Sequence, residues 1–229
     1  MNRGVISGDV IAYTSLSNTD KTNFETAVKQ LLKDINIRFG TYGRMIKGDY
    51  LECYIPDPVN ALRVALAIKS YVKSFSLELN DSKDKRINAF KTYGIRLAIG
   101  IGEISRFDPQ KGIIDGEAIY FSGRIIGESR TTSDKERIVI KSTLFIKTND
   151  ENLNNEFEPL LALIDVLVSK ATARQCKVLY LKLTGNNEEA IAKKLKLFQS
   201  TINEHSTSLG WNAIEKAVLH FEQIMKLKL

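Results

Sequence analysis

Hydrophobic residues follow two different periods in the first 148 residues of the chain. From Ile95 to Gly102 large apolar residues alternate with other types, which predicts a β-strand. Apolar residues recur at helical spacing from Phe24 to Ile35 and from Leu62 to Val72, and helix-capping residues precede both stretches. Further strands are expected over residues 4–12, around a Gly-Asp turn near residue 48, and over 137–141. This order of elements is typical of an α+β sandwich of the ferredoxin-like or palm type.

The pattern changes at about residue 148. A polar stretch over 149–155 predicts a linker, and only helical spacing follows it. We therefore expect a domain over 1–148 and an all-α helical domain over 149–229. Its expected helices cover 153–167, 172–184, 188–195, 199–209 and 211–225. In the first domain, residues 80–91 are expected to form a loop and 112–116 a turn.

Two aspartates occupy related places in the first domain. Asp9 lies where the first strand gives way to a polar turn, and Asp49 lies at the tip of the expected hairpin. If the two strands are neighbours, both carboxylates meet at one edge of the sheet and repel each other. A Mg²⁺ or Mn²⁺ ion would remove that penalty, since hard cations prefer oxygen ligands. The alternative is that Asp9 only caps a helix and Asp49 only occupies a turn.

The polar turn after Asp9 leads into the N-terminus of a helix. Free backbone N–H groups at such a terminus suit a phosphate group. Together with the expected cation, this arrangement predicts a site for a nucleoside phosphate.

Composition and charge narrow the possible classes of protein. The chain has 229 residues, 43% of them hydrophobic, and a formal net charge of +6. From Ala171 onward the chain has nine Lys and Arg residues and five Asp and Glu residues, so much of the positive excess lies in the helical region. The two cysteines are too few for a disulfide framework. Without a signal peptide or a long apolar run, we expect a cytoplasmic protein with no membrane contact.

Four segments together resemble the class III adenylyl and guanylyl cyclases. Residues 9–16 (DVIAYTSL) look like the family's D-I-V-G-F-T-x-L signature, and Gly48-Asp49 resembles its second metal-binding segment. Residues 95–103 and 116–124 resemble a glycine-containing strand and the helix G-D-x-V-N-x-A-A-R. The closer resemblance is to the SatD-like family, which joins a cyclase-like domain to a helical DNA-binding-like region. It is carried by residues 115–118 (DGEA) and by 160–165 followed by 172–175.

The resemblance implies roles for individual residues. Asp9 and Asp49 would bind the metal ions, and Arg124 would stabilise phosphoryl charge from the other subunit of a homodimer. The backbone that would hold the phosphates comprises Val10, Ile11, Ala12, Tyr13, Thr14 and Ser15.

Three positions depart from the cyclase pattern. Met45 and Ile113 stand where cyclases read the base, and Tyr120 stands where they place an asparagine on the ribose. Cyclisation depends on alignment of the ribose oxygen with the α-phosphate, so these changes argue against purine cyclase activity while leaving metal and phosphate binding intact.

The segment from Gln175 to His205 resembles a helix-turn-helix of the sigma-region-4 type. Its polar and basic side chains would contact base edges or phosphates of double-stranded DNA. They are Lys193, Lys194, Lys196, Gln199, Ser200, Thr201, Asn203 and His205. The alternative is a helical bundle that serves only for dimerisation.

Three functions remain open at this point. The leading hypothesis is a DNA-binding transcriptional regulator, homodimeric, with a degenerate cyclase-like domain that senses a nucleotide with its metal ion. The second is a working nucleotidyl cyclase or another metal-dependent phosphoryl-transfer enzyme, in which Tyr120 replaces the missing contacts. The third is a non-catalytic dimeric scaffold.

Overall fold

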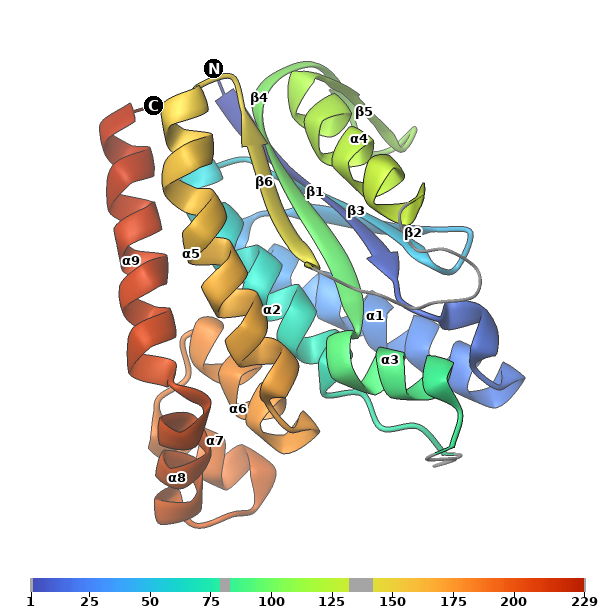
Figure 1. Cartoon of the computed structure of the whole chain (residues 1–229), viewed down its shortest axis with the longest axis vertical. Coiled ribbons are helices and arrows are strands. Elements are labelled where there is room, and N and C mark those ends of the chain that lie inside the picture. The colour runs from blue at the N-terminus through green and yellow to red at the C-terminus, as the bar shows by residue number, and fades with distance from the viewer. Residues whose placement is uncertain (1, 79–82, 132–141, 229) are drawn as a thin grey trace.

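A mixed β-sheet forms the centre of the molecule (Figure 1). The computed structural model describes residues 2–78, 83–131 and 142–228. In this part of the chain six strands follow the order β2-β3-β1-β4-β5, with β6 also paired to β4. Among the strand pairs of the described residues, only β4–β6 is parallel. The strands are β1 (Asn2–Val10), β2 (Tyr42–Ile46), β3 (Tyr50–Ile55), β4 (Ile95–Asp108), β5 (Ile113–Gly116) and β6 (Leu144–Thr148).

Helices cover both faces of this sheet. On one face the core packs α1 (Asn18–Phe39) and α2 (Ala61–Lys73) against strand residues such as Ile6 and Leu97. On the other face α4 (Glu117–Thr131) lies across β1 and β4, as Figure 1 shows. Successive side chains of β1 point to opposite faces of the sheet. Ile6 therefore enters the core with α1 and α2, while Ser7 forms a hydrogen bond with Ser122 of α4. The expected α+β class is confirmed.

Gly100 allows α4 to approach the sheet closely. A Cβ atom at this position would overlap the carbonyl oxygen of Ala118 and crowd the amide nitrogen of Ser122. Glycine at this position therefore admits the backbone of α4 beside the strand.

After residue 150 the regular elements of the described chain are all helices. They are α5 (Glu151–Lys170), α6 (Ala173–Leu183), α7 (Glu188–Leu195), α8 (Gln199–Leu209) and α9 (Trp211–Lys228). Each lies within a few residues of its predicted range, and the starts and ends predicted for α7 and α8 agree with the structure. The hydrophobic core continues from the sheet into these helices, because α6 packs on α2 and α5 packs on β6. The division of the chain into two domains at residue 148 stays a prediction.

Several local expectations need correction. A loop was expected over residues 80–91, but residues 85–91 belong to α3 (Lys85–Tyr93), which Asp84 caps and which buries Phe90. Residues 113–116, expected in a turn, form β5 against the distal half of β4. The expected linker is largely absent, because Asp150 caps α5 and the helix begins at Glu151. The strand expected over 137–141 lies outside the described residues.

A buried ion pair joins the sheet side of the molecule to the helical region. Lys69 of α2 is fully buried, and its Nζ lies 3.1 Å from Asp165 Oδ1 of α5. Lys69 also donates to Thr143 Oγ1 at 2.6 Å, and Asp165 accepts a 2.6 Å bond from the Thr143 backbone. Burial alone would raise the pKa of Asp165, but the Lys69 charge and the Thr143 bonds hold it below its usual value.

Replacement of Lys69 by Met should strongly destabilise the protein. The change leaves the Asp165 carboxylate buried without its counter-charge, which costs about 3–5 kcal/mol in such sites. Urea unfolding followed by circular dichroism measures the loss. Lys147→Met is the control, since its pair with Glu151 lies at the surface, where ion pairs contribute little. Similar losses in the two variants would contradict a structural role for the buried pair.

Both cysteines should be unreactive in the folded protein. Cys53 and Cys176 are fully buried, and burial raises the pKa of Cys53 to about 12 and that of Cys176 to about 11. The reactive thiolate is therefore scarce at about pH 8. A thiol-titrating reagent should label neither residue in the native state and both in denaturant. Rapid labelling of native protein would contradict the packing around α6 and β3.

Candidate functional site

The backbone segments that carry Asp9 and Asp49 lie side by side at one end of neighbouring strands. In the β1–β3 pair Asp9 lies opposite Tyr50, and the Val10 N–H donates to the Asp49 carbonyl oxygen at 2.9 Å. The two strands are adjacent, as the sequence analysis required. The meeting point is the end of central strand β1, however, and not a lateral edge of the sheet.

Arg96 compensates the charge of Asp9. It lies opposite Asp9 in the β1–β4 pair, and its Nη1 lies 3.3 Å from Asp9 Oδ2. Both side chains are largely buried, with exposed fractions of 7% for Arg96 and 14% for Asp9. Within the strand motif of residues 95–103, no sequence feature singles out Arg96 for this role. Asp9 therefore already has one counter-charge in the protein.

The donor set suits a cation that arrives with a phosphate. The described residues contain no group of three or more His, Cys, Asp or Glu side chains that could hold a metal ion. Mg²⁺, however, is commonly bound by one or two carboxylates, with substrate phosphates and water as its other ligands. The chemistry of Asp9 and Asp49 thus fits a metal–nucleotide complex better than a metal site made by protein alone.

Tyr13 and Glu25 add a second polar pair beside the hairpin tip. The Tyr13 hydroxyl donates to Glu25 Oε1 at 2.6 Å. Burial raises the pKa of Tyr13 most, and the Glu25 and Asp49 carboxylates raise it further. Gly48 has φ +80°, and a Cβ there would lie 2.9 Å from the Tyr13 hydroxyl. Sequence reasoning missed Glu25, because no local pattern distinguishes it from the other charged residues of α1.

The loop after Asp9 offers fewer free amides than its sequence suggested. The N–H groups of Val10, Ile11 and Ser15 donate to carbonyl oxygens of the protein. Residues 12–14 are thus the part of the predicted phosphate segment left for a ligand. Ala12 has the left-handed φ of 55°, which turns the chain into a short 3₁₀ helix, η1 (Tyr13–Ser15).

The residues predicted near the base and ribose are spread over three elements. Tyr120 is 61% exposed on α4 and donates to Asp115 Oδ1 at 2.5 Å. Arg124 is exposed on the same helix, and Ile113 is half-buried in β5. Met45 of β2 packs against the core formed with α1 and α2. The β-sheet places Met45 opposite Leu51 and therefore on the face away from Asp9.

The predicted DNA-contacting residues gather on α7, α8 and the turn between them. Lys196 has a left-handed φ of 55°, and Ile191 and Ile202 are fully buried between the helices. Glu188 of α7 accepts a 2.8 Å bond from Lys182 and also contacts Asn203 and Ser206 of α8. Thr201 and His205 are half-buried, and the other predicted contacts are exposed: Lys193, Lys194, Lys196, Gln199, Ser200 and Asn203.

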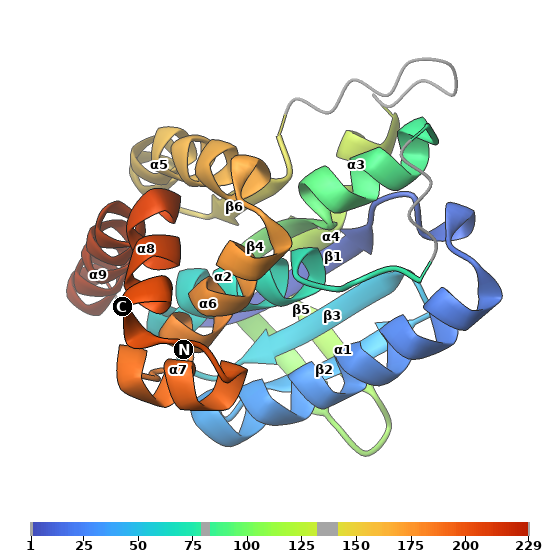
Figure 2. The same ribbon diagram turned by 90° about the horizontal axis from the view of Figure 1, so that it is seen from below.

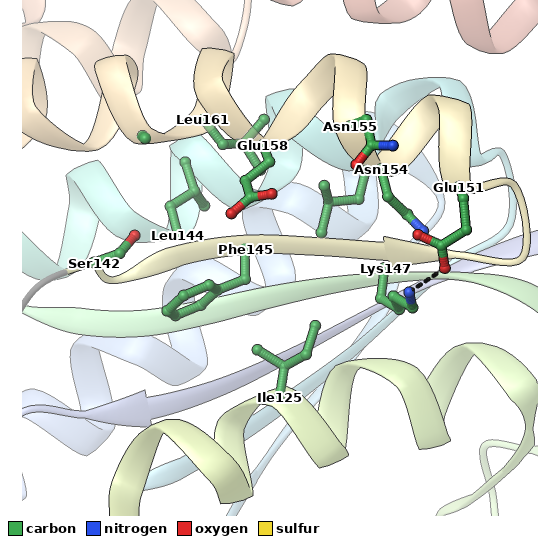
Figure 3. A pocket seen from close by; sticks show the side chains of 12 residues that line it. Ile125, Ser142, Leu144, Phe145, Lys147, Glu151, Asn154, Asn155, Glu158 and Leu161 are labelled. Carbon is green, nitrogen blue, oxygen red and sulfur yellow. Dashed lines mark hydrogen bonds and ion pairs between the residues drawn. The ribbon is translucent and has the colours of Figure 1, made fainter. Parts of the chain in front are cut away.

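A cavity of about 350 Å³ lies elsewhere, between β6, α4 and α5 (Figure 3). Ile125, Leu144 and Leu161 contribute apolar lining, and Lys147 forms a 2.6 Å ion pair with Glu151 at its border. None of the residues predicted for the nucleotide or DNA sites lines it.

In the described part of the chain, no helix combines the length and apolar character that crossing a bilayer requires.

Comparison with known proteins yields similarity of fold alone. No family model and no curated protein matches the sequence, so the SatD-like resemblance stays a prediction. A bacterial light-regulated adenylyl cyclase is similar over 64% of this chain, at 13% identity and a TM-score of 0.44, and this chain spans 43% of its length. The guanylyl cyclase domain of the RhoGC fusion protein from the aquatic fungus Blastocladiella emersonii is similar over 57% of this chain and 74% of its own, at 18% identity and a TM-score of 0.37. The adenylyl cyclase CyaB from P. aeruginosa is similar over 56% of this chain and 71% of its own, at 14% identity and a TM-score of 0.38. Scores this low bear on neither the site nor the activity of this chain.

Proposed function

We propose that this chain is a DNA-binding regulator whose cyclase-like half binds a nucleoside phosphate together with Mg²⁺ or Mn²⁺. The observation that carries the proposal is the contact between Val10 and Asp49, which brings two carboxylate-bearing residues to the start of a polar loop. The α7–turn–α8 unit supports the second half of the proposal, and a homodimer would serve both.

Charge balance supports a ligand that combines cation and phosphate. Asp9 and Asp49 would supply negative charge for the cation, and the Arg96 guanidinium beside Asp9 balances one of the two charges. The metal ion, when bound, would neutralise phosphate charge. Residues 12–14 would hold the phosphate oxygens, since their neighbours in the loop already use their amides within the protein.

The remaining residues fit a protein that binds a nucleotide but does not cyclise it efficiently. Met45 faces the core and Ile113 is apolar, so neither side chain can hydrogen-bond a purine. Tyr120 and Arg124 are exposed on α4, where they would be accessible to a second copy of the chain.

The turn between α7 and α8 supports DNA binding. In a helix-turn-helix, a turn of three or four residues joins the two helices, and the N-terminal residues of the second helix meet base edges in the major groove. Residues 196–198 form such a turn, and three exposed lysines border it. Lysines placed in this way contact backbone phosphates, which makes the binding sensitive to salt.

Mn²⁺ with a nucleoside triphosphate should raise the melting temperature of the protein. A ligand present at a hundred times its Kd adds about 2.7 kcal/mol of stability. A panel of triphosphates and cyclic nucleotides, each with and without Mn²⁺, measures the shift. The Asp9→Asn, Asp49→Asn double variant should lose it.

The matched control for this experiment is Asp84→Asn. Asp84 caps α3, and asparagine caps helices equally well. An unchanged melting temperature across the whole panel, or an equal shift in the double variant, would contradict the nucleotide site. Formation of cyclic product that depends on both aspartates would favour the enzyme over the sensor.

Removal of Lys193 and Lys194 should weaken DNA binding on every sequence. Each lysine that contacts a phosphate steepens the dependence of log Kd on log salt by about one unit, so the double alanine variant should show a shallower slope. Changing Gln199 or Asn203 should instead relax preference at particular base pairs. Fluorescence anisotropy with labelled duplexes at several salt concentrations measures both effects.

Lys85→Ala with Arg86→Ala provides the charge control. This pair is exposed on α3, on the opposite side of the molecule from α7 and α8 in Figure 2, and its loss removes the same charge. Equal weakening by both double variants would assign the effect to net charge. Wild-type protein that retains no duplex even at low salt would indicate a dimerisation bundle.

A further inference from the structure

We propose that Phe198 is a specificity-determining residue that contacts the C5-methyl group of a thymine in the bound DNA. This inference rests on the proposed DNA binding and assigns a role to the residue that directly precedes α8.

Phe198 leaves a large apolar ring in water. Its side chain is 81% exposed, whereas Phe157 and Phe221 of the same helical region are fully buried. A buried phenylalanine side chain contributes about 1.5–3 kcal/mol, and Phe198 gives up most of this in the free protein.

The same residue also forgoes a helix cap. Side chains of Asp150, Thr172 and Asn187 accept hydrogen bonds at the N-termini of α5, α6 and α7. Phe198 holds the equivalent position of α8 and makes no such bond. Ser, Thr, Asn or Asp at this position typically stabilises a helix by about 0.5–2 kcal/mol relative to a residue that cannot cap. Phenylalanine here thus serves neither burial nor capping.

The turn nevertheless holds Phe198 in one place. Leu197 N–H donates to the Ala192 carbonyl at 3.0 Å, and Ile202 N–H donates to the Phe198 carbonyl at 3.2 Å. Lys196, which directly precedes Leu197, adopts the left-handed backbone conformation. A non-glycine residue takes this conformation only at a cost in free energy. A ring mounted on a fixed backbone loses little conformational entropy when it meets a ligand.

Thymine is the DNA group that suits this side chain. Residues at the N-terminus of the second helix of a helix-turn-helix approach base edges in the major groove. The phenyl ring has no hydrogen-bond donor or acceptor, so it gains nothing from a phosphate or an amino group. The thymine methyl is the apolar feature of that groove, and phenylalanine is among the residues that contact it.

Substitution of deoxyuridine for thymidine removes only this methyl group and keeps the base pair. A preferred duplex is first selected from a random library with the wild-type protein, and each thymine is then replaced in turn. At one or more positions the wild type should lose about fourfold in affinity, as expected for one methyl group. Phe198→Ala should bind more weakly and show no loss at those positions.

Phe198→Ser keeps the test independent of folding. Serine restores the missing cap, so this variant should melt at a higher temperature than the wild type while remaining insensitive to deoxyuridine. Leu197→Ala is the control variant at the neighbouring position, and it should remain as sensitive to deoxyuridine as the wild type.

The outcomes separate this inference from the proposed function. If the wild type binds duplex but no replacement affects it, or if Phe198→Ala keeps the same sensitivity, the role of Phe198 is wrong and DNA binding stands. If Phe198→Ala binds DNA as well as the wild type, the ring serves another partner, such as a protein. If the wild type binds no duplex at any salt concentration, both proposals fail.

Discussion

The contact between Lys69 and Asp165 is the constraint on which the arrangement of the two halves depends. A lysine and an aspartate in the interior tolerate burial only when they neutralise each other and satisfy their remaining hydrogen bonds. Lys69 meets this condition through Asp165, Thr143 and the carbonyl of Ile95. The network therefore joins α2, α5 and the starts of β4 and β6. These contacts hold the helical region at a defined position beside the sheet.

Further contacts extend this connection toward the α7–turn–α8 unit. α2 packs against α6, and Tyr180 of α6 donates to Asp34 near the end of α1 at 3.2 Å. Arg63 of α2 forms a 2.6 Å ion pair with Glu222 of α9. α1 itself begins just after the loop expected to hold phosphate. Packed helices thus connect the candidate nucleotide site to the candidate DNA-binding helices.

More of the charges at the end of β1 have a partner within the protein than the sequence suggested. Asp9 is balanced by Arg96, and Glu25 holds the Tyr13 hydroxyl next to the hairpin tip. Because Asp9 already has a partner in the protein, a metal ion at this site would have to bind in combination with a phosphate that supplies further ligands. In the proposed metal–nucleotide complex, the phosphate oxygens would supply the ligands that the protein lacks.

The sequence by itself determined most of the elements and their types. Periodicity placed α1, α2 and the five C-terminal helices, since burial of one helix face imposes a repeat that can be read residue by residue. Motif order located Asp9 and Asp49 at strand ends. Only the tertiary structure decided features that depend on partners distant in the chain. β5 forms because β4 lies beside it, and the pairings of Arg96 with Asp9 and of Glu25 with Tyr13 follow from strand register and helix placement. The same holds for Lys69 and Asp165, whose charges would indicate surface positions until the fold brings them together.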